Sequence, residues 1–186
     1  MEKQVEQELS LKETIVDHEI HGVTPEMIDW WWANMEKGYP LWCPEEHKSF
    51  VWEVPPTKDM FIGAIQIAEE SISGPPVRKL RIRWEDPKTS PIPIIYEHAL
   101  LCAGIGPDDK PVAYLLHQYE ATPYGTRMRS TFHPVIPRPQ VANDNWAKHN
   151  KDEMSHFPEF LPQLFKMWQN VKDPKFNVPC NLKFKK

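Results

Sequence analysis

Residues 112–135 read VAYLLHQYEATPYGTRMRSTFHPV. Two apolar or alternating runs, 112–121 and 126–135, flank a short segment containing Pro123 and Gly125, and each run has the length and pattern of a strand. Four earlier runs, bounded by Pro, Gly or Asp, share this pattern: 49–54, 60–72, 77–84 and 94–103. Six strands with no helical pattern between them predict one antiparallel sheet.

A helix is predicted before these strands. Thr24 is suited to be its N-cap, Pro25 its first residue and Glu26 an acid in its first turn. We expect this helix to run from Pro25 to about Lys37 and to be closed by Gly38 at the C′ position.

A second helical pattern follows the strands. Asn143 or Asp144 can cap a helix that continues through His149 and Glu153. The prolines of the segment 157–162 (FPEFLP) should kink this helix or start another one that reaches Asn170.

The simplest assembly is an α+β fold in which a strongly curved antiparallel sheet wraps around the C-terminal helix and leaves a cavity between them. Residues 1–20 carry alternating charge and are expected to form a peripheral leader, either frayed or a short helix. Residues 21–170 would form a single domain, and 171–186 an extended tail.

Composition limits the kinds of function. The chain has 186 residues, a formal net charge of −4 and scattered basic residues apart from the tail 183–186, so nucleic acid is not an expected partner. No signal peptide and no membrane span are predicted, because the longest apolar stretch, 92–105, is broken by proline and charge. Cys43, Cys102 and Cys180 lack paired spacing, which favours a reducing cytoplasm. The sequence is compatible with a homo-oligomer.

Candidate metal ligands are spread along the chain. His149 and Glu153 are four residues apart, so a helix would place both on one face, although about one such pair is expected by chance at this composition. His47 lies at the entrance to the first predicted strand. Glu69 and Glu70 close an apolar strand and, taken locally, are more often solvated turn residues.

Several separated motifs together resemble one known family. They are GVTPEMIDWWW at 22–32, Tyr39-x-Leu41-Trp42-x-Pro44-x-x-His47, Met128-Arg129-Ser130-x-Phe132, and His149-x-x-x-Glu153-Met154 followed by FLP at 160–162. In this order they resemble the 2,4-diacetylphloroglucinol hydrolase family, which includes phloretin hydrolase, and the resemblance covers about residues 20–168. The resemblance implies a helix-grip fold similar to the Bet v 1 and START domains. It also implies zinc-dependent hydrolysis of a carbon–carbon bond between an acyl group and a phenolic ring.

By position, the resemblance implies four zinc ligands: His47, Glu70, His149 and Glu153. Glu70 is preferred to Glu69 because it aligns with the acid before the family's turn, here at 72–74, whereas strand alternation leaves the choice open. Two histidines and two carboxylates suit zinc but also iron or manganese, so the choice of Zn²⁺ rests on the resemblance.

The resemblance further assigns His117 as an active-site acid or base and Tyr39 as the group that holds the phenolic ring. An isolated histidine in an apolar strand is more often a hydrogen-bonded core residue. Two positions depart from the family's pattern, since Phe50 stands where an asparagine and Phe132 where a second tyrosine would contact the ring. The expected substrate is therefore an acylated phenol or another 1,3-dicarbonyl compound. The alternatives are a non-catalytic module that binds an aromatic or lipid-like molecule, and an Fe(II) oxygenase.

Overall fold

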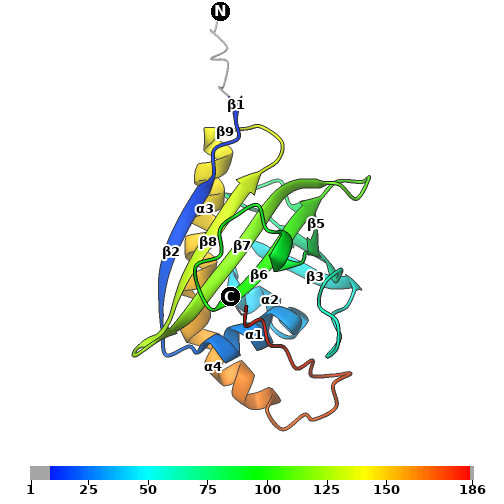
Figure 1. Ribbon diagram of the computed structural model, residues 1–186, viewed down its shortest axis with the longest axis vertical. Helices are drawn as coiled ribbons and strands as arrows, with labels where there is room; N and C mark the ends of the chain where they lie inside the picture. The colour runs from blue at the N-terminus through cyan, green and yellow to red at the C-terminus, as the bar shows by residue number, and fades with distance from the viewer. Residues whose placement is uncertain (1–8, 185–186) are drawn as a thin grey trace, which may run out of the picture.

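A computed structural model describes residues 9–184 of the chain. A seven-stranded, fully antiparallel sheet curves around one long helix, and the remaining helices gather at one end of the sheet (Figure 1). The strands are β1 (Leu9–Ser10), β2 (Thr14–His21), β3 (His47–Val54), β4 (Ile65–Glu70), β5 (Arg78–Trp84), β6 (His98–Ile105), β7 (Pro111–Thr122), β8 (Gly125–Pro134) and β9 (Arg138–Pro139). The helices are α1 (Pro25–Ala33), α2 (Tyr39–Trp42), α3 (Gln140–Ser155) and α4 (Phe157–Trp168), with 3₁₀ turns η1 (Met35–Lys37) and η2 (Pro87–Thr89).

The sheet order is β2-β8-β7-β6-β5-β4-β3, and β1 pairs separately with β9. All six predicted strands are present in the large sheet, with shifted ends. The run 60–72 becomes a strand only at Ile65, after a turn in which Gly63 adopts a φ of +87°. The run 94–103 begins pairing only at His98, because the N–H groups of Ile95 and Tyr96 donate to the side chain of Gln118 and not to a neighbouring strand.

The seventh strand, β2, corrects the expectation of a frayed leader or short helix over residues 1–20. Residues 14–21 pair along their whole length with β8, so they belong to the sheet. The alternating charge is the outer face of an edge strand: Asp17 accepts hydrogen bonds from Arg129 at 2.7 and 2.9 Å, while Ile20 is buried. The leader predicted at residues 1–8 lies outside the described residues.

The first helix starts as predicted and ends earlier. The side chain of Thr24 accepts a hydrogen bond from the Met27 N–H at 3.4 Å, and Pro25 follows as the first helical residue. The helix ends at Ala33 because Asn34 leaves the helical conformation and donates side-chain hydrogen bonds to the carbonyls of Trp30 and Val178. The chain continues as the 3₁₀ turn η1 to Lys37, and Gly38 caps this turn, but its φ of −164° is not the left-handed conformation expected of a C′ glycine.

The C-terminal helix also starts away from its predicted cap. It begins at Gln140, directly after Pro139, and not at Asn143 or Asp144, because the preceding residues pair with β1 and the fixed φ of proline leads into a helix. A separate helix, α4, follows from Phe157 to Trp168, in agreement with the alternative of a second helix.

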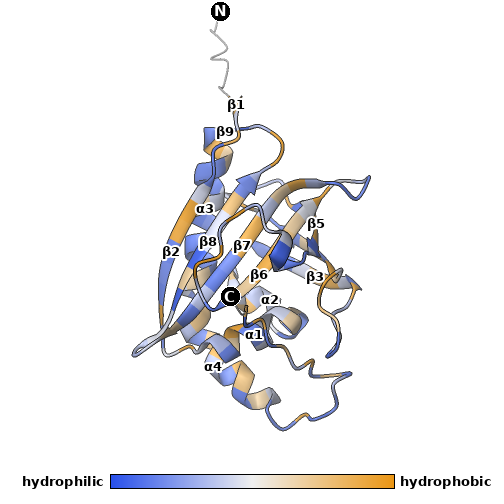
Figure 2. Ribbon diagram, in the orientation of Figure 1, coloured by the Kyte–Doolittle hydropathy of each residue, from blue (hydrophilic) through white to orange (hydrophobic). Residues whose placement is uncertain are grey.

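The core lies between the concave face of the sheet and the helices. Hydropathy alternates along the strands, as Figure 2 shows, because successive side chains face the core and the solvent in turn. The aromatic run Trp30–Trp32 is almost fully buried in this core. The segment after α4 turns at residues 173–177 and then crosses the fold at β6, where the Ala99 N–H donates to the Leu182 carbonyl at 3.1 Å. Residues 185 and 186 of the predicted tail lie outside the described residues.

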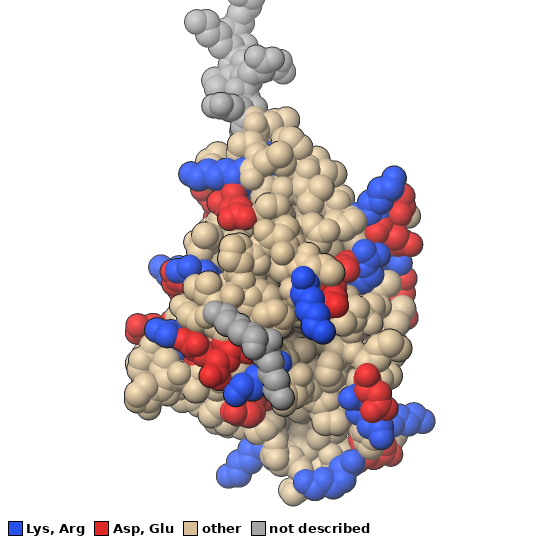
Figure 3. Space-filling model, in the orientation of Figure 1, with Lys and Arg blue, Asp and Glu red and all other residues tan. Residues whose placement is uncertain are grey.

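Charged side chains of both signs are interleaved on the face shown in Figure 3, which carries no field of one sign. None of the helices among the described residues is long and apolar enough to span a membrane.

Candidate metal centre

The four predicted ligands come from two strands and one helix. His47 begins β3 and Glu70 ends β4, and the antiparallel pairing makes these two residues direct partners. His149 and Glu153 lie one turn apart on α3. All four are buried, with relative exposures of 2 to 7%, so the fold brings residues separated by more than a hundred positions into one desolvated cluster.

The donor atoms of the four residues face one another. Nε2 of His47 lies 3.9 Å from Oε1 of Glu70 and 3.6 Å from Oε2 of Glu153. Nε2 of His149 lies 3.5 Å from Oε2 of both Glu70 and Glu153. Ligands held about 2.1 Å from a tetrahedral zinc ion are separated by about 3.4 Å, and these distances of 3.5 to 3.9 Å are close to that value. Glu70 meets the two histidines through different oxygens, Oε1 for His47 and Oε2 for His149.

The tautomer of His47 supports the same arrangement. Its Nδ1 donates to the backbone carbonyl of Tyr39 at 3.2 Å, and a carbonyl can only accept, so Nε2 carries the lone pair. This Nε2 atom is buried and has no hydrogen-bond partner among the described residues. A buried, unsatisfied acceptor pointing at two carboxylates is unfavourable unless a cation lies between them.

The pairing of β3 with β4 decides which of Glu69 and Glu70 faces the cluster, a choice that strand alternation alone left open. Glu70 faces the cluster, whereas Glu69 points to the opposite, exposed face and accepts a hydrogen bond from Ser49 Oγ at 2.8 Å. Glu70 is therefore the member of the pair with access to the centre.

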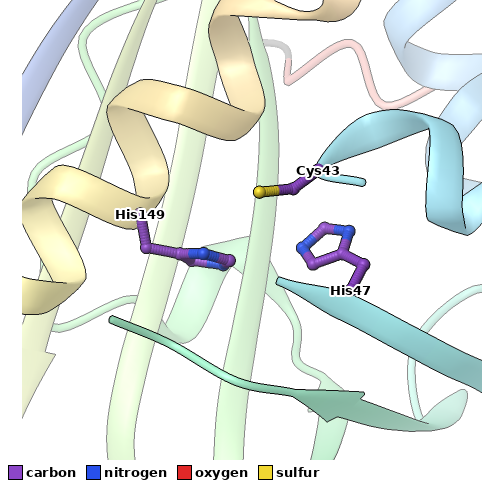
Figure 4. Close-up of side chains that lie close together, drawn as sticks. All are labelled: Cys43, His47 and His149. Carbon is purple, nitrogen blue, oxygen red and sulfur yellow. The ribbon is translucent and has the colours of Figure 1, made fainter. Parts of the chain in front are cut away.

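Cys43 lies close to the same histidines. Its sulfur and one ring nitrogen each of His47 and His149 lie within 4.8 Å of one another, and Figure 4 shows the thiol directed toward the space between the two rings. The thiol also contacts Asp152 Oδ2 at 3.8 Å. Two overlapping donor sets thus share His47 and His149, one completed by two carboxylates and one by a thiol.

Neighbouring polar residues fix the orientation of the ligands on α3. Nδ1 of His149 donates a short hydrogen bond to Glu46, which turns Nε2 toward the carboxylates. Asn150 donates to Glu153 Oε1 at 2.8 Å and accepts from His18 Nε2 at 3.0 Å. Such outer partners commonly hold metal ligands in their binding geometry.

Sequence reasoning missed these supporting residues together with Cys43. The nearest signal was position, because Cys43 and Glu46 precede His47 by four residues and one residue, and Asn150 directly follows His149. His18 had no such signal, since it belongs to the strand that was predicted to be a leader.

The pKa values of His149 and Glu153 reflect a histidine that lies among carboxylates. Burial alone would lower the pKa of His149, but the charge of Glu153, a hydrogen bond with Cys43, the charge of Glu70 and a hydrogen bond with Glu46 together raise it to about 10. Burial alone would raise the pKa of Glu153, but the positive charge of the nearby His149 lowers it. The site therefore concentrates carboxylates around two histidines, an environment that favours a positive charge.

The two predicted catalytic residues lie at the same cavity. His117 on β7 is buried, stacks on Trp32 with ring centroids 5.0 Å apart, and shares a hydrogen bond with Ser130 Oγ at 2.9 Å. Burial lowers the pKa of His117 to about 4, so the ring is neutral at neutral pH. Tyr39 stacks on the His47 ring, and its hydroxyl donates to Glu70.

A cavity of about 700 Å³ opens beside this cluster. Tyr39, Glu70, His117, His149 and Glu153 all line it, together with the aromatic side chains of Trp32, Trp42, Phe132 and Trp146. Phe132 is one of the two departures from the expected polar contacts and faces the cavity. Phe50, the other, is not among the lining residues and packs against the rings of Tyr39 and Trp52.

Comparison with known proteins identifies the family. The model of the DAPG hydrolase PhiG domain matches residues 14–134, which is more than half of the chain. The chain belongs to this family. The matched range contains Tyr39, His47, Glu70 and His117 and ends before α3, which carries His149 and Glu153. Membership supports hydrolase activity in general. No curated protein sequence matches this chain.

Solved structures agree on the fold of this DAPG hydrolase family member. The solution structure of KanY protein is 6% identical, covers 82% of this chain and 99% of its own, and has a TM-score of 0.59. A protein from Rhodobacter sphaeroides is 17% identical, with coverage of 86% and 99% and a TM-score of 0.54. Ara h 8.0201 is 12% identical, with coverage of 82% and 99% and a TM-score of 0.53. The expected α+β, Bet v 1-like helix-grip fold is thus confirmed.

Proposed function

We propose that this protein is a zinc-dependent hydrolase that cleaves the carbon–carbon bond between an acyl group and a phenolic ring, or the equivalent bond of a 1,3-dicarbonyl compound. The observation that carries the proposal is the meeting of two histidines and two glutamates in one cluster, three members of which, Glu70, His149 and Glu153, line a cavity with aromatic walls. Membership of the DAPG hydrolase family supports the reaction class.

The donor set suits zinc. His47, Glu70, His149 and Glu153 would hold the ion, and the unsatisfied Nε2 of His47 is the strongest sign that a cation belongs there. Bound zinc would supply a Lewis acid for the acyl carbonyl and lower the pKa of a coordinated water toward about 7. Glu46 and Asn150 would keep His149 and Glu153 in place.

His117 would move the proton that the reaction requires. Burial keeps the imidazole of His117 neutral at neutral pH, so it can accept a proton from the attacking water. It can then deliver that proton to the carbon of the phenolic ring from which the acyl group is cleaved. If Nδ1 donates to Ser130, the lone pair of Nε2 is available for this transfer. The overall reaction adds one water and yields a carboxylic acid and the shortened phenol.

Tyr39 would orient the substrate. Its hydroxyl donates to Glu70, which leaves the lone pairs of the phenol oxygen free to accept a hydrogen bond from a ring hydroxyl of the substrate. Trp32, Trp42 and Trp146 provide flat apolar walls for an aromatic body. Phe132 offers no hydrogen bond, so the bound ring is expected to have an apolar contact on that side.

The proposal is tested by metal analysis followed by a substrate panel. Purified protein should contain stoichiometric zinc by mass spectrometry, His149→Ala should lose it, and His133→Ala, a surface histidine paired with Glu13, should keep it. Incubation with acylphloroglucinols and β-diketones should release carboxylate. Protein without stoichiometric metal, or an unchanged metal content in His149→Ala, would refute the zinc site. Bound iron together with consumption of oxygen during turnover would show that the protein is an oxygenase and not a hydrolase.

We also propose a cytoplasmic location, which the three free cysteines support, because thiols remain reduced there.

A further inference from the structure

Three arginines line the cavity, and two of them, Arg78 and Arg138, come from different strands and form no ion pair among the described residues. Arg78 begins β5, where it is the direct partner of Glu70 on β4, and directly opposed residues share one face of a sheet. It also alternates with Leu80 and Ile82, which pack against the core. Arg138 lies on β9, and its guanidinium rests over the ring of Phe132, 4.3 Å from the ring centre.

These two arginines differ from all others in the chain. Four of the six arginines form ion pairs with carboxylates: Arg81 with Glu53 and Asp109, Arg83 with Glu85, Arg127 with Glu120, and Arg129 with Asp17. Arg78 and Arg138 have no carboxylate within 4.0 Å among residues 9–184. Both unpaired guanidinium groups therefore line the cavity, whereas the third arginine there, Arg81, is matched by Glu53 and Asp109.

Arg138 is half-buried and bears the cost of partial desolvation, whereas Arg78 is exposed to solvent. Burial lowers the pKa of the Arg138 guanidinium, and the nearby positive charge of Arg78 lowers it further. One N–H of Arg138 is used, since Nη2 donates to the Ala142 carbonyl at 3.0 Å, and this contact holds the group in position. The remaining N–H groups of a guanidinium are suited to an anionic oxygen group.

We propose that Arg78 and Arg138 form an anion-binding subsite, so that the ligand of the cavity is an aromatic molecule carrying a carboxylate or phenolate. The inference deepens the proposed function by naming the charge of the substrate. The anion would lie between the two guanidinium groups while the aromatic body reaches the tryptophan walls and the metal centre. Phe132 then supports Arg138 instead of contacting a substrate hydroxyl.

A pair of dyes that share an aromatic body tests the subsite. Anilinonaphthalenesulfonate is anionic and phenylnaphthylamine is neutral, and both report binding by fluorescence. Arg78→Gln and Arg138→Gln should each lower the affinity for the anionic dye by about tenfold, which is the effect of one charge-assisted hydrogen bond. The affinity for the neutral dye should fall by less than about twofold. Arg83→Gln, from the same strand but paired with Glu85, should change neither.

Competition then separates the two anions. Displacement of the dye by a hydroxybenzoic acid but not by its methyl ester identifies a carboxylate, and displacement by the ester only when its phenol is ionised identifies a phenolate. Retained binding of the neutral dye shows that each variant keeps its cavity. Equal effects on both dyes, or no effect of either substitution, would overturn the subsite. Dye binding needs no turnover, so an absence of hydrolysis would refute the proposed function alone.

Discussion

Glu70 and Glu69 are adjacent in sequence and face opposite sides of β4, so matched substitutions separate a metal ligand from a surface acid. Glu70→Gln replaces a carboxylate that lies 3.5 Å from His149 Nε2 and 3.9 Å from His47 Nε2 with a neutral amide of the same shape. Loss of an outer partner of a metal ligand costs about 10- to 100-fold in affinity, so loss of a ligand should cost at least about 100-fold, or about 2.7 kcal/mol.

Zinc affinity is measured by competition with a fluorescent chelator. Glu69→Gln should bind zinc within about twofold of the unchanged protein, because the side chain of Glu69 points away from the cluster and accepts a hydrogen bond from Ser49 on the opposite face of the sheet. The amide of Glu70→Gln can still accept the hydrogen bond of Tyr39, so the fold should persist, which circular dichroism checks. Equal zinc affinity in the two variants would refute the assignment of Glu70, and a loss confined to Glu69→Gln would reverse it.

Three further predictions address the surroundings of the centre. Glu46→Gln should weaken zinc binding by about 10- to 100-fold because Glu46 orients His149, whereas Glu45→Gln, which alters an exposed neighbour, should not; equal affinities would exclude this role of Glu46. Cobalt-substituted protein should lack a sulfur-to-cobalt charge-transfer band if the carboxylates complete the site; a band that disappears in Cys43→Ser would show that the thiol binds the metal. His117 is neutral in the folded protein down to a pKa of about 4, so the stability that it contributes is present above pH 6.5 and lost as the pH falls. The difference in free energy of unfolding between the unchanged protein and His117→Gln should narrow by about 2.5 kcal/mol from pH 7 to about pH 4.5, and a constant difference would contradict the burial of a neutral ring.

Local sequence patterns correctly predicted the elements whose side chains alternate or cap in the usual way. The six strands from 49 to 135 and the start at Thr24 follow from apolar alternation and capping, and both are present. Strand β2 was missed because its outward charges, such as Asp17, resemble a solvated leader until Arg129 on β8 is placed beside them. Its pairing is a long-range fact that no local pattern contains.

In the candidate site, too, local sequence patterns suggested single residues, whereas their grouping depends on the fold. The spacing of His149 and Glu153 was at the level of chance, and only the fold brings them to His47 and Glu70. Alternation along one strand could not choose between Glu69 and Glu70, since that choice depends on the register with β3. Contacts such as Asn150 with Glu153 depend on tertiary packing in the same way.

The central claim is metal-dependent hydrolysis of an acyl–aryl bond, and quantifying carboxylate release from a diacylphloroglucinol tests it most directly. The account predicts that carboxylate and the deacylated phenol appear in equal amounts, that a chelator stops their release, and that added zinc restores it. Release that continues unchanged in metal-free protein, or no release by zinc-loaded protein from any acylated phenol or β-diketone in the panel, would contradict it.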